Sequence, residues 1–118
     1  RKVKKKKYYF NLNLYRNMPF HLNNNLKKEM KRQVTELGLD FKYNKFNLTY
    51  RLYLMDNRLR DISNVCSVID KYVCDALVEN DNVPEDNYQH LDKITYEFGG
   101  VDKDNPRCEV YVQEIKDG

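Results

Sequence analysis

Residues 46–54 alternate between apolar and polar side chains, and this pattern constrains the fold more than any other in the chain. Alternation with a period of two is typical of a β-strand that has one buried face. A strand of this kind needs a covering layer on its apolar side. We expect the following side chains to point inward: Phe46, Leu48, Tyr50, Leu52 and Leu54.

The rest of the chain alternates strand and helix patterns. Residues 8–15 and the segments around 94–98 and 108–112 show strand alternation, the last two joined as a hairpin through 99–106. Helical spacing runs from about Asn23 to Gly38, which we expect to end the helix as a C-terminal glycine, and again over 61–79. The order β-α-β-α-β-β predicts an α+β fold, a mixed sheet with two helices packed on it.

Length and composition predict one domain. The 118 residues suit a single core, with residues 1–7 as a basic N-terminal tail and residues 8–118 as the domain. The apolar runs are too short for a membrane span or a secretory segment. Three cysteines without metal-type spacing argue against a disulfide framework, and we expect a reducing cytoplasm.

Charge is divided unevenly between the two halves of the chain. Residues 1–60 carry sixteen Lys and Arg against four Asp and Glu, whereas residues 61–118 carry five against fourteen. A basic half next to an acidic half is expected where one part grips a polyanion and the other binds a cation. The alternative is a salt-bridged surface with a solvated tail.

The helix predicted over 61–79 carries a polar stripe. At about 100° per residue, Asp61, Asn64, Lys71 and Asp75 fall within roughly 80° of one another, and Asp70 points away from them. Two arginines, Arg58 and Arg60, come just before the stripe in the sequence. A polar stripe beside an apolar one favours a metal and phosphate site on a core helix.

Asp61 and Asp86 are the natural pair to hold Mg²⁺, with Glu85 in reserve, because this cation prefers oxygen ligands. Asp75 is fourteen residues from Asp61, roughly 20 Å along a straight helix, and cannot share its metal. Each residue also has a purely structural explanation: Asp61 or Ser63 as a helix cap, Asp86 as turn chemistry, Lys71 as a solvated side chain.

A second basic surface lies on the first predicted helix. Four cations share the side opposite its apolar residues and follow a run of asparagines. They are placed either to track phosphates or to form a solvated helix face. These residues are Lys27, Lys28, Lys31 and Arg32.

The motifs of the second half form an ordered series. They are Arg60-Asp61-Ile62-Ser63-Asn64, Asp70-Lys71, Asp75-Ala76-Leu77 and Glu85-Asp86-Asn87. This series resembles the RusA family of Holliday junction endodeoxyribonucleases, common in phages and prophages, whose pattern is R-D-x-D-N, a lysine, D-A-L and an acidic pair. The resemblance covers the whole chain and has the same order of elements.

The resemblance implies roles for four residues. Asp61 and Asp86 match metal-binding carboxylates, Lys71 matches the catalytically important lysine, and Asp75 matches the aspartate of the D-A-L motif. Ser63 departs from the pattern, because many relatives have a second aspartate there. Glu85, or a water held by Ser63, would compensate for the lost carboxylate.

The helix also departs from the family pattern in length. The distance from Asn64 to Lys71 is about one helical turn longer, and an insertion of four residues nearly preserves the helical face. Lys71 is therefore still expected to point toward the site.

The sequence thus predicts a homodimeric, Mg²⁺-dependent endodeoxyribonuclease that cuts four-way junctions or other branched DNA in the cytoplasm of a bacterial host. One alternative is a branched-DNA-binding module that has lost cleavage, motivated by Ser63. A second is a small phage structural or interaction protein whose charge division serves self-assembly.

Overall fold

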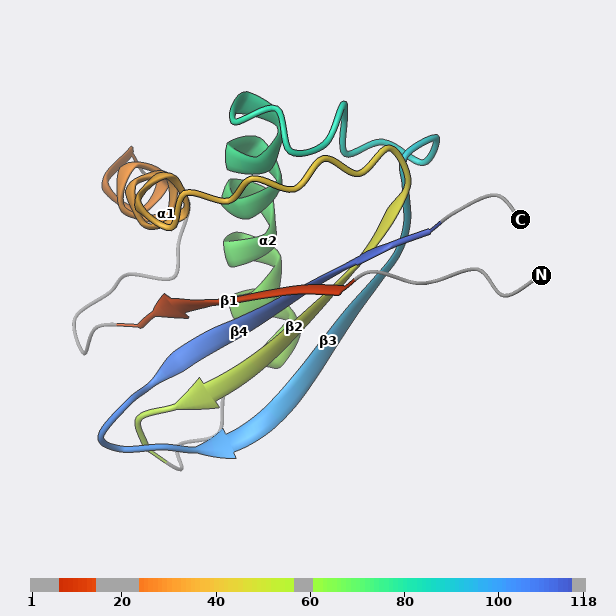
Figure 1. Ribbon diagram of the computed structural model, residues 1–118. Coiled ribbons are helices and arrows are strands. Elements are labelled where there is room, and N and C mark those ends of the chain that lie inside the picture. Colours follow the sequence, from red (N-terminus) through yellow and green to blue (C-terminus); the bar gives the residue numbers. More distant parts are fainter. Residues whose placement is uncertain (1–6, 15–23, 57–60, 116–118) are drawn as a thin grey trace.

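A computed structural model describes residues 7–14, 24–56 and 61–115, which form one four-stranded mixed sheet and two helices (Figure 1). This arrangement confirms the predicted α+β class and the predicted order of elements. Along the chain the elements are β1 (Lys7–Asn13), α1 (Asn24–Glu36), β2 (Phe46–Leu54), α2 (Ile62–Glu79), β3 (Leu91–Val101) and β4 (Arg107–Glu114).

The predicted hairpin between the last two strands is wrong. The strand order in the sheet is β1-β4-β2-β3, so β2 lies between β3 and β4. It pairs in parallel with β3 and antiparallel with β4, and α2 is the crossover that joins the two parallel strands. Alternation along one segment identifies a strand and its buried face, but it does not specify which strand lies beside it.

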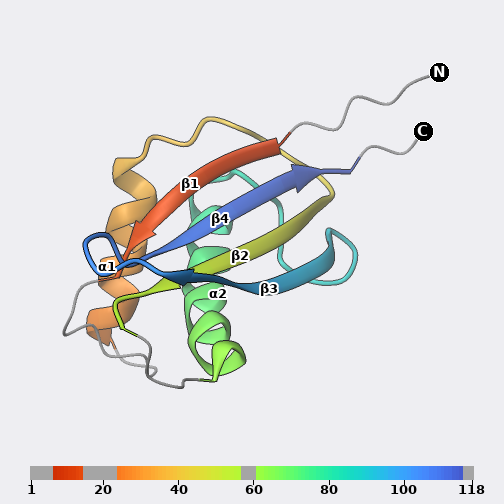
Figure 2. The ribbon, with the colours of Figure 1, turned by 90° about the horizontal axis from the view of Figure 1, so that it is seen from below.

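Both helices pack on the same face of the sheet, as the two ribbon views show (Figures 1 and 2). Burial alternates strictly along β2, which confirms its predicted inward and outward faces. The helices contribute matching apolar stripes. In α1 the stripe is Leu26, Met30 and Val34; in α2 it includes Val65, Cys66, Ile69, Tyr72, Val73, Cys74, Ala76 and Leu77.

The segments that follow the two helices are held in different ways. Gly38 has φ +61, a conformation that glycine adopts without strain, and its N–H donates to the carbonyl of Thr35. It therefore ends α1 as predicted. After α2, the side chain of Asn82 donates to the carbonyls of Leu39 (3.0 Å) and Phe41 (2.8 Å). These bonds tie the loop before β3 to the segment between α1 and β2. Neither described helix is long and apolar enough to cross a membrane.

Candidate functional site

The predicted polar stripe lies on the solvent side of α2. Asp61, Asn64, Lys71 and Asp75 are all exposed, while the apolar residues of the helix face the sheet. The helix therefore buries one side in the core and offers the other to a ligand. The two arginines that were predicted to lead into the stripe, Arg58 and Arg60, are outside the described residues.

Asp61 is the N-cap of α2, as predicted for it or Ser63. Its Oδ1 accepts hydrogen bonds from the backbone N–H of Ser63 (3.1 Å) and from the Ser63 hydroxyl (2.8 Å). These bonds lower the pKa of the Asp61 carboxyl below its usual value. The exposed side chain is thus ionised at neutral pH, and the Ser63 hydroxyl helps to orient it.

A second carboxylate on α2 has a different environment. Asp70 is half-buried, and its Oδ1 accepts hydrogen bonds from the Tyr50 hydroxyl (2.6 Å) and the Cys74 thiol (3.3 Å). The pKa of Asp70 is raised, mainly because the carboxyl is buried. The two hydrogen bonds lower this pKa and the negative charge of Asp86 raises it, but burial outweighs the hydrogen bonds. Asp70 points away from the stripe, as predicted.

The electrostatic neighbour of Asp86 is therefore Asp70 in the middle of α2. Burial raises the pKa of Cys74, one turn further along, and the charges of Asp70 and Asp86 add to this effect. Asp61 lies nine residues before Asp70, about 13 Å along the helix axis. The approach of Asp86 to Asp70 has no signal in the sequence, because an exposed loop carries no periodic pattern that places it against a particular turn of a helix.

The three residues predicted to bind Mg²⁺ do not gather into one site. Asp61 is at the start of α2, whereas Glu85 and Asp86 are in the loop that follows its end. Within residues 7–14, 24–56 and 61–115, no group of three His, Cys, Asp or Glu could hold a metal ion. Since Mg²⁺ is often held by one or two carboxylates with waters and substrate phosphates, the ionised and exposed Asp61 fits a ligand of that kind.

The basic side of α1 is partly neutralised by acids. Lys27 and Lys28 are exposed. Lys31 pairs with Glu79 of α2, which ties the two helices together. The guanidinium of Arg32 pairs with Glu29 (2.6 Å) and Glu36 (2.7 Å). Phosphate contacts by Lys31 or Arg32 would thus replace existing ion pairs, which leaves Lys27 and Lys28 as the readier phosphate ligands of this helix.

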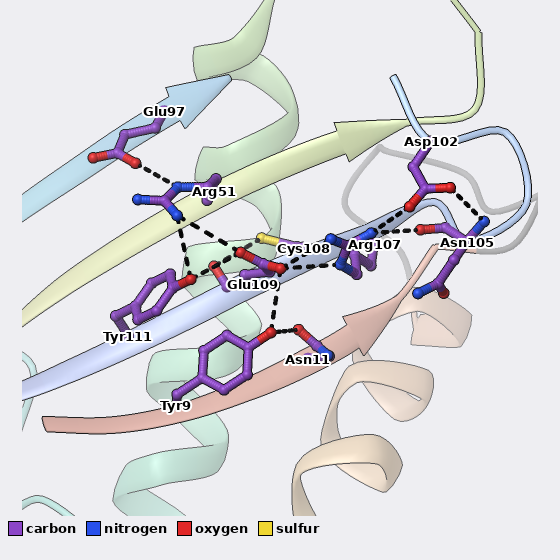
Figure 3. Close-up of polar contacts among 10 residues, drawn as sticks. All are labelled: Tyr9, Asn11, Arg51, Glu97, Asp102, Asn105, Arg107, Cys108, Glu109 and Tyr111. Atoms are coloured by element: carbon purple, nitrogen blue, oxygen red, sulfur yellow. Dashed lines mark hydrogen bonds and ion pairs between the residues drawn. The ribbon is translucent and has the colours of Figure 1, made fainter. Parts of the chain in front are cut away.

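The open face of the sheet carries a polar network that sequence reasoning missed (Figure 3). At its centre Glu109 of β4, only 7% exposed, accepts hydrogen bonds from the hydroxyls of Tyr111 (2.8 Å) and Tyr9 (3.2 Å) and from Arg107 Nε (3.1 Å). The charged residues at outward positions of the strands indicate that such a network can form. Which residues pair with one another depends on the strand order, which the sequence pattern does not give.

The network joins neighbouring strands without leaving free positive charge. Arg51 of β2 pairs with Glu97 of β3 at 2.8 Å, and Arg107 pairs with Asp102 at 2.8 Å. With Glu109 between them, three acids face two arginines (Figure 3). This network, with more acids than arginines, is therefore suited to holding the sheet together rather than to binding a polyanion.

Replacing Glu109 with glutamine is expected to lower the free energy of unfolding at pH 7 by about 1–3 kcal/mol, since the donors around it lose a charged acceptor. Burial raises the pKa of Glu109, but the bonds from Tyr111, Arg107 and Tyr9 outweigh burial and lower it. The stabilisation is thus present above the unfolded pKa, about 4.3, and lost as pH falls through the lower folded value. Urea unfolding at pH 7 measures the loss of stability caused by the substitution, and urea unfolding at pH 3 measures how much of the stabilisation has gone at low pH.

The matched control for this change is Glu36→Gln, which removes an exposed ion pair with Arg32. Little change in stability is expected from it, because exposed pairs contribute little. A Glu109→Gln protein as stable as the wild type at pH 7 would contradict the assigned role of the network.

A scan against known protein families and a search of curated proteins found no match to this chain.

Proposed function

We propose that this chain is a Mg²⁺-dependent endodeoxyribonuclease that acts as a homodimer on four-way junctions or other branched DNA. The observation that carries the proposal is the exposed stripe of Asp61, Asn64, Lys71 and Asp75 at the N-cap and along α2, the helix that holds the lysine and D-A-L motifs. Its likeness to the RusA pattern supplies the reaction class, and the basic first half of the chain supplies affinity for a polyanion.

Each residue of the stripe has a role in this proposal. Asp61, ionised and fixed at the N-cap, is a carboxylate ligand for the metal. When bound, Mg²⁺ polarises the phosphate and makes a water molecule more acidic. Lys71 places a cation beside the negative charge that develops on the phosphate. Asp75, one turn further along α2, orients Lys71.

The DNA backbone is bound by cations on two parts of the chain in this proposal. Lys27 and Lys28 project from α1, and Arg58 and Arg60 precede Asp61 in the sequence. Asn64 contributes a neutral donor on the stripe. Because each phosphate contact releases counterions, affinity for DNA should fall steeply as salt concentration rises. Two-fold symmetry would let one dimer address the two equivalent strands of a junction.

The direct test uses the purified chain and a synthetic four-way junction with labelled strands. With Mg²⁺ we expect paired nicks near the branch point; linear duplex of the same sequence and junction without Mg²⁺ should stay intact. A junction that stays uncut and is bound no more tightly than duplex would overturn the proposal.

A second candidate is a junction-binding module without cleavage. It is favoured by Ser63, which stands where a carboxylate would complete the family pattern, and by the separation of Asp61 from Asp86. Under this alternative the wild type binds junctions tightly without cutting them. A Ser63→Asp variant that gains Mg²⁺-dependent nicking would then support it.

A further inference from the structure

Of the two edge strands in the described part of the sheet, β3 is the longer, with 11 residues against 7 in β1. β3 is the last strand in the order β1-β4-β2-β3, and within residues 7–14, 24–56 and 61–115 it pairs only with β2. Figure 2 shows it at the margin of the sheet, opposite β1. An edge of this length offers a row of backbone N–H and C=O groups to another strand.

Apolar side chains accompany this edge. Ile94 is 42% exposed and Phe98 is 49% exposed. Their partners on β2, Leu48 and Leu52, are fully buried on the face that the helices cover. Ile94 and Phe98 therefore lie on the same face, but the helices do not cover them fully. At the other edge, Phe10 of β1 is buried, and Tyr9, 46% exposed, already contacts Glu109 and Tyr111 of the same chain. Exposed apolar residues beside an unpaired strand edge are typical of a surface that another chain covers.

The strand is also self-complementary. Register shifts interrupt its pairing with β2 near each end and leave a regular segment from Lys93 to Phe98. Ile94 and Phe98 are placed symmetrically about Tyr96, so an antiparallel copy centred there sets each isoleucine opposite a phenylalanine. On the other face, Lys93 and Glu97 have opposite charges and become diagonal neighbours across the pair, where Lys93 would join the existing ion pair of Glu97 with Arg51.

We propose that β3 pairs antiparallel with β3 of a second copy of this chain, with Tyr96 on the two-fold axis. The two sheets then continue as one, and Ile94 contacts the partner's Phe98. A two-fold interface requires a surface that complements itself, which the apolar symmetry and the opposite charges of this strand provide. The proposal deepens the suggested homodimer by naming its surface, and it does not depend on cleavage.

The mass in solution tests the proposal with the full chain and without DNA. Sedimentation equilibrium should give twice the 14.3 kDa of one chain. The double variant Ile94→Lys/Phe98→Lys should sediment as a monomer with an unchanged circular dichroism spectrum, because like charges would meet across the pair. The matched control Leu37→Lys alters another exposed apolar residue, 44% exposed, and should remain dimeric.

Cross-linking tests the register. The double variant Ile94→Cys/Phe98→Cys should form a disulfide-linked dimer on mild oxidation, whereas each single variant should not. The native thiols of Cys66, Cys74 and Cys108 are buried, and burial raises their pKa values, so they should not compete. A monomeric wild type, or a dimer that tolerates both lysines and does not cross-link, would overturn the proposal. Neither outcome decides whether the chain cuts a junction, although a monomeric wild type would also remove the homodimer from the proposed function.

Discussion

The Asp61→Asn variant should lose Mg²⁺-dependent cleavage of a four-way junction by at least about 100-fold while keeping the stability of the wild type. Asparagine removes the negative charge proposed to hold the metal. It keeps a side-chain oxygen at the N-cap, where asparagine and aspartate are about equally favourable. The bonds to Ser63 can therefore persist. Single-turnover cleavage and thermal unfolding, measured on the same preparation, separate the two effects.

Two further variants make this experiment specific. Asp61→Ala removes both the charge and the cap, so it should lose cleavage and also unfold more readily. Asp40→Asn alters an exposed aspartate outside α2 and should change neither quantity. If Asp61→Asn cuts as fast as the wild type, Asp61 serves only as a cap, and the metal ligands must be sought elsewhere.

The sequence could predict those parts of the fold that depend on one segment at a time. The alternation of β2, the apolar stripe of α2, its cap at Asp61 and the glycine that ends α1 are all confirmed. Each is a local property, since a period of two or 3.6 residues determines which side of an element is buried. Strand neighbours are not local, and the predicted hairpin failed for that reason.

The candidate site also has a part that local patterns predict and a part that they do not. Helical periodicity placed Asp61, Lys71 and Asp75 on one exposed face. It could not place Asp86, because the loop from α2 to β3 sets that position, and the structure brings Asp86 toward Asp70. Nor could it show that Arg32 is paired with acids of its own helix. Contacts made through loops and long side chains require the three-dimensional structure.

A large loss of stability is expected from truncating the buried side of the same helix. Ile69→Ala should lower the free energy of unfolding by about 3 kcal/mol, because Ile69 is fully buried between α2 and the sheet and its removal leaves a cavity. Both helices cover the same face of one sheet, so the described residues share one core that must absorb the change. Urea unfolding should show a lower midpoint with an unchanged slope.

The control for this truncation is Ser67→Ala, two residues away on the exposed side of α2, which should leave stability nearly unchanged. Cleavage by Ile69→Ala should persist at temperatures where the variant is folded, because the truncation leaves the exposed stripe in place. A loss below about 1 kcal/mol would mean that the neighbouring side chains collapse into the space. A loss of cleavage in the folded variant would mean that the geometry of the exposed stripe depends on the packing of Ile69 in the core.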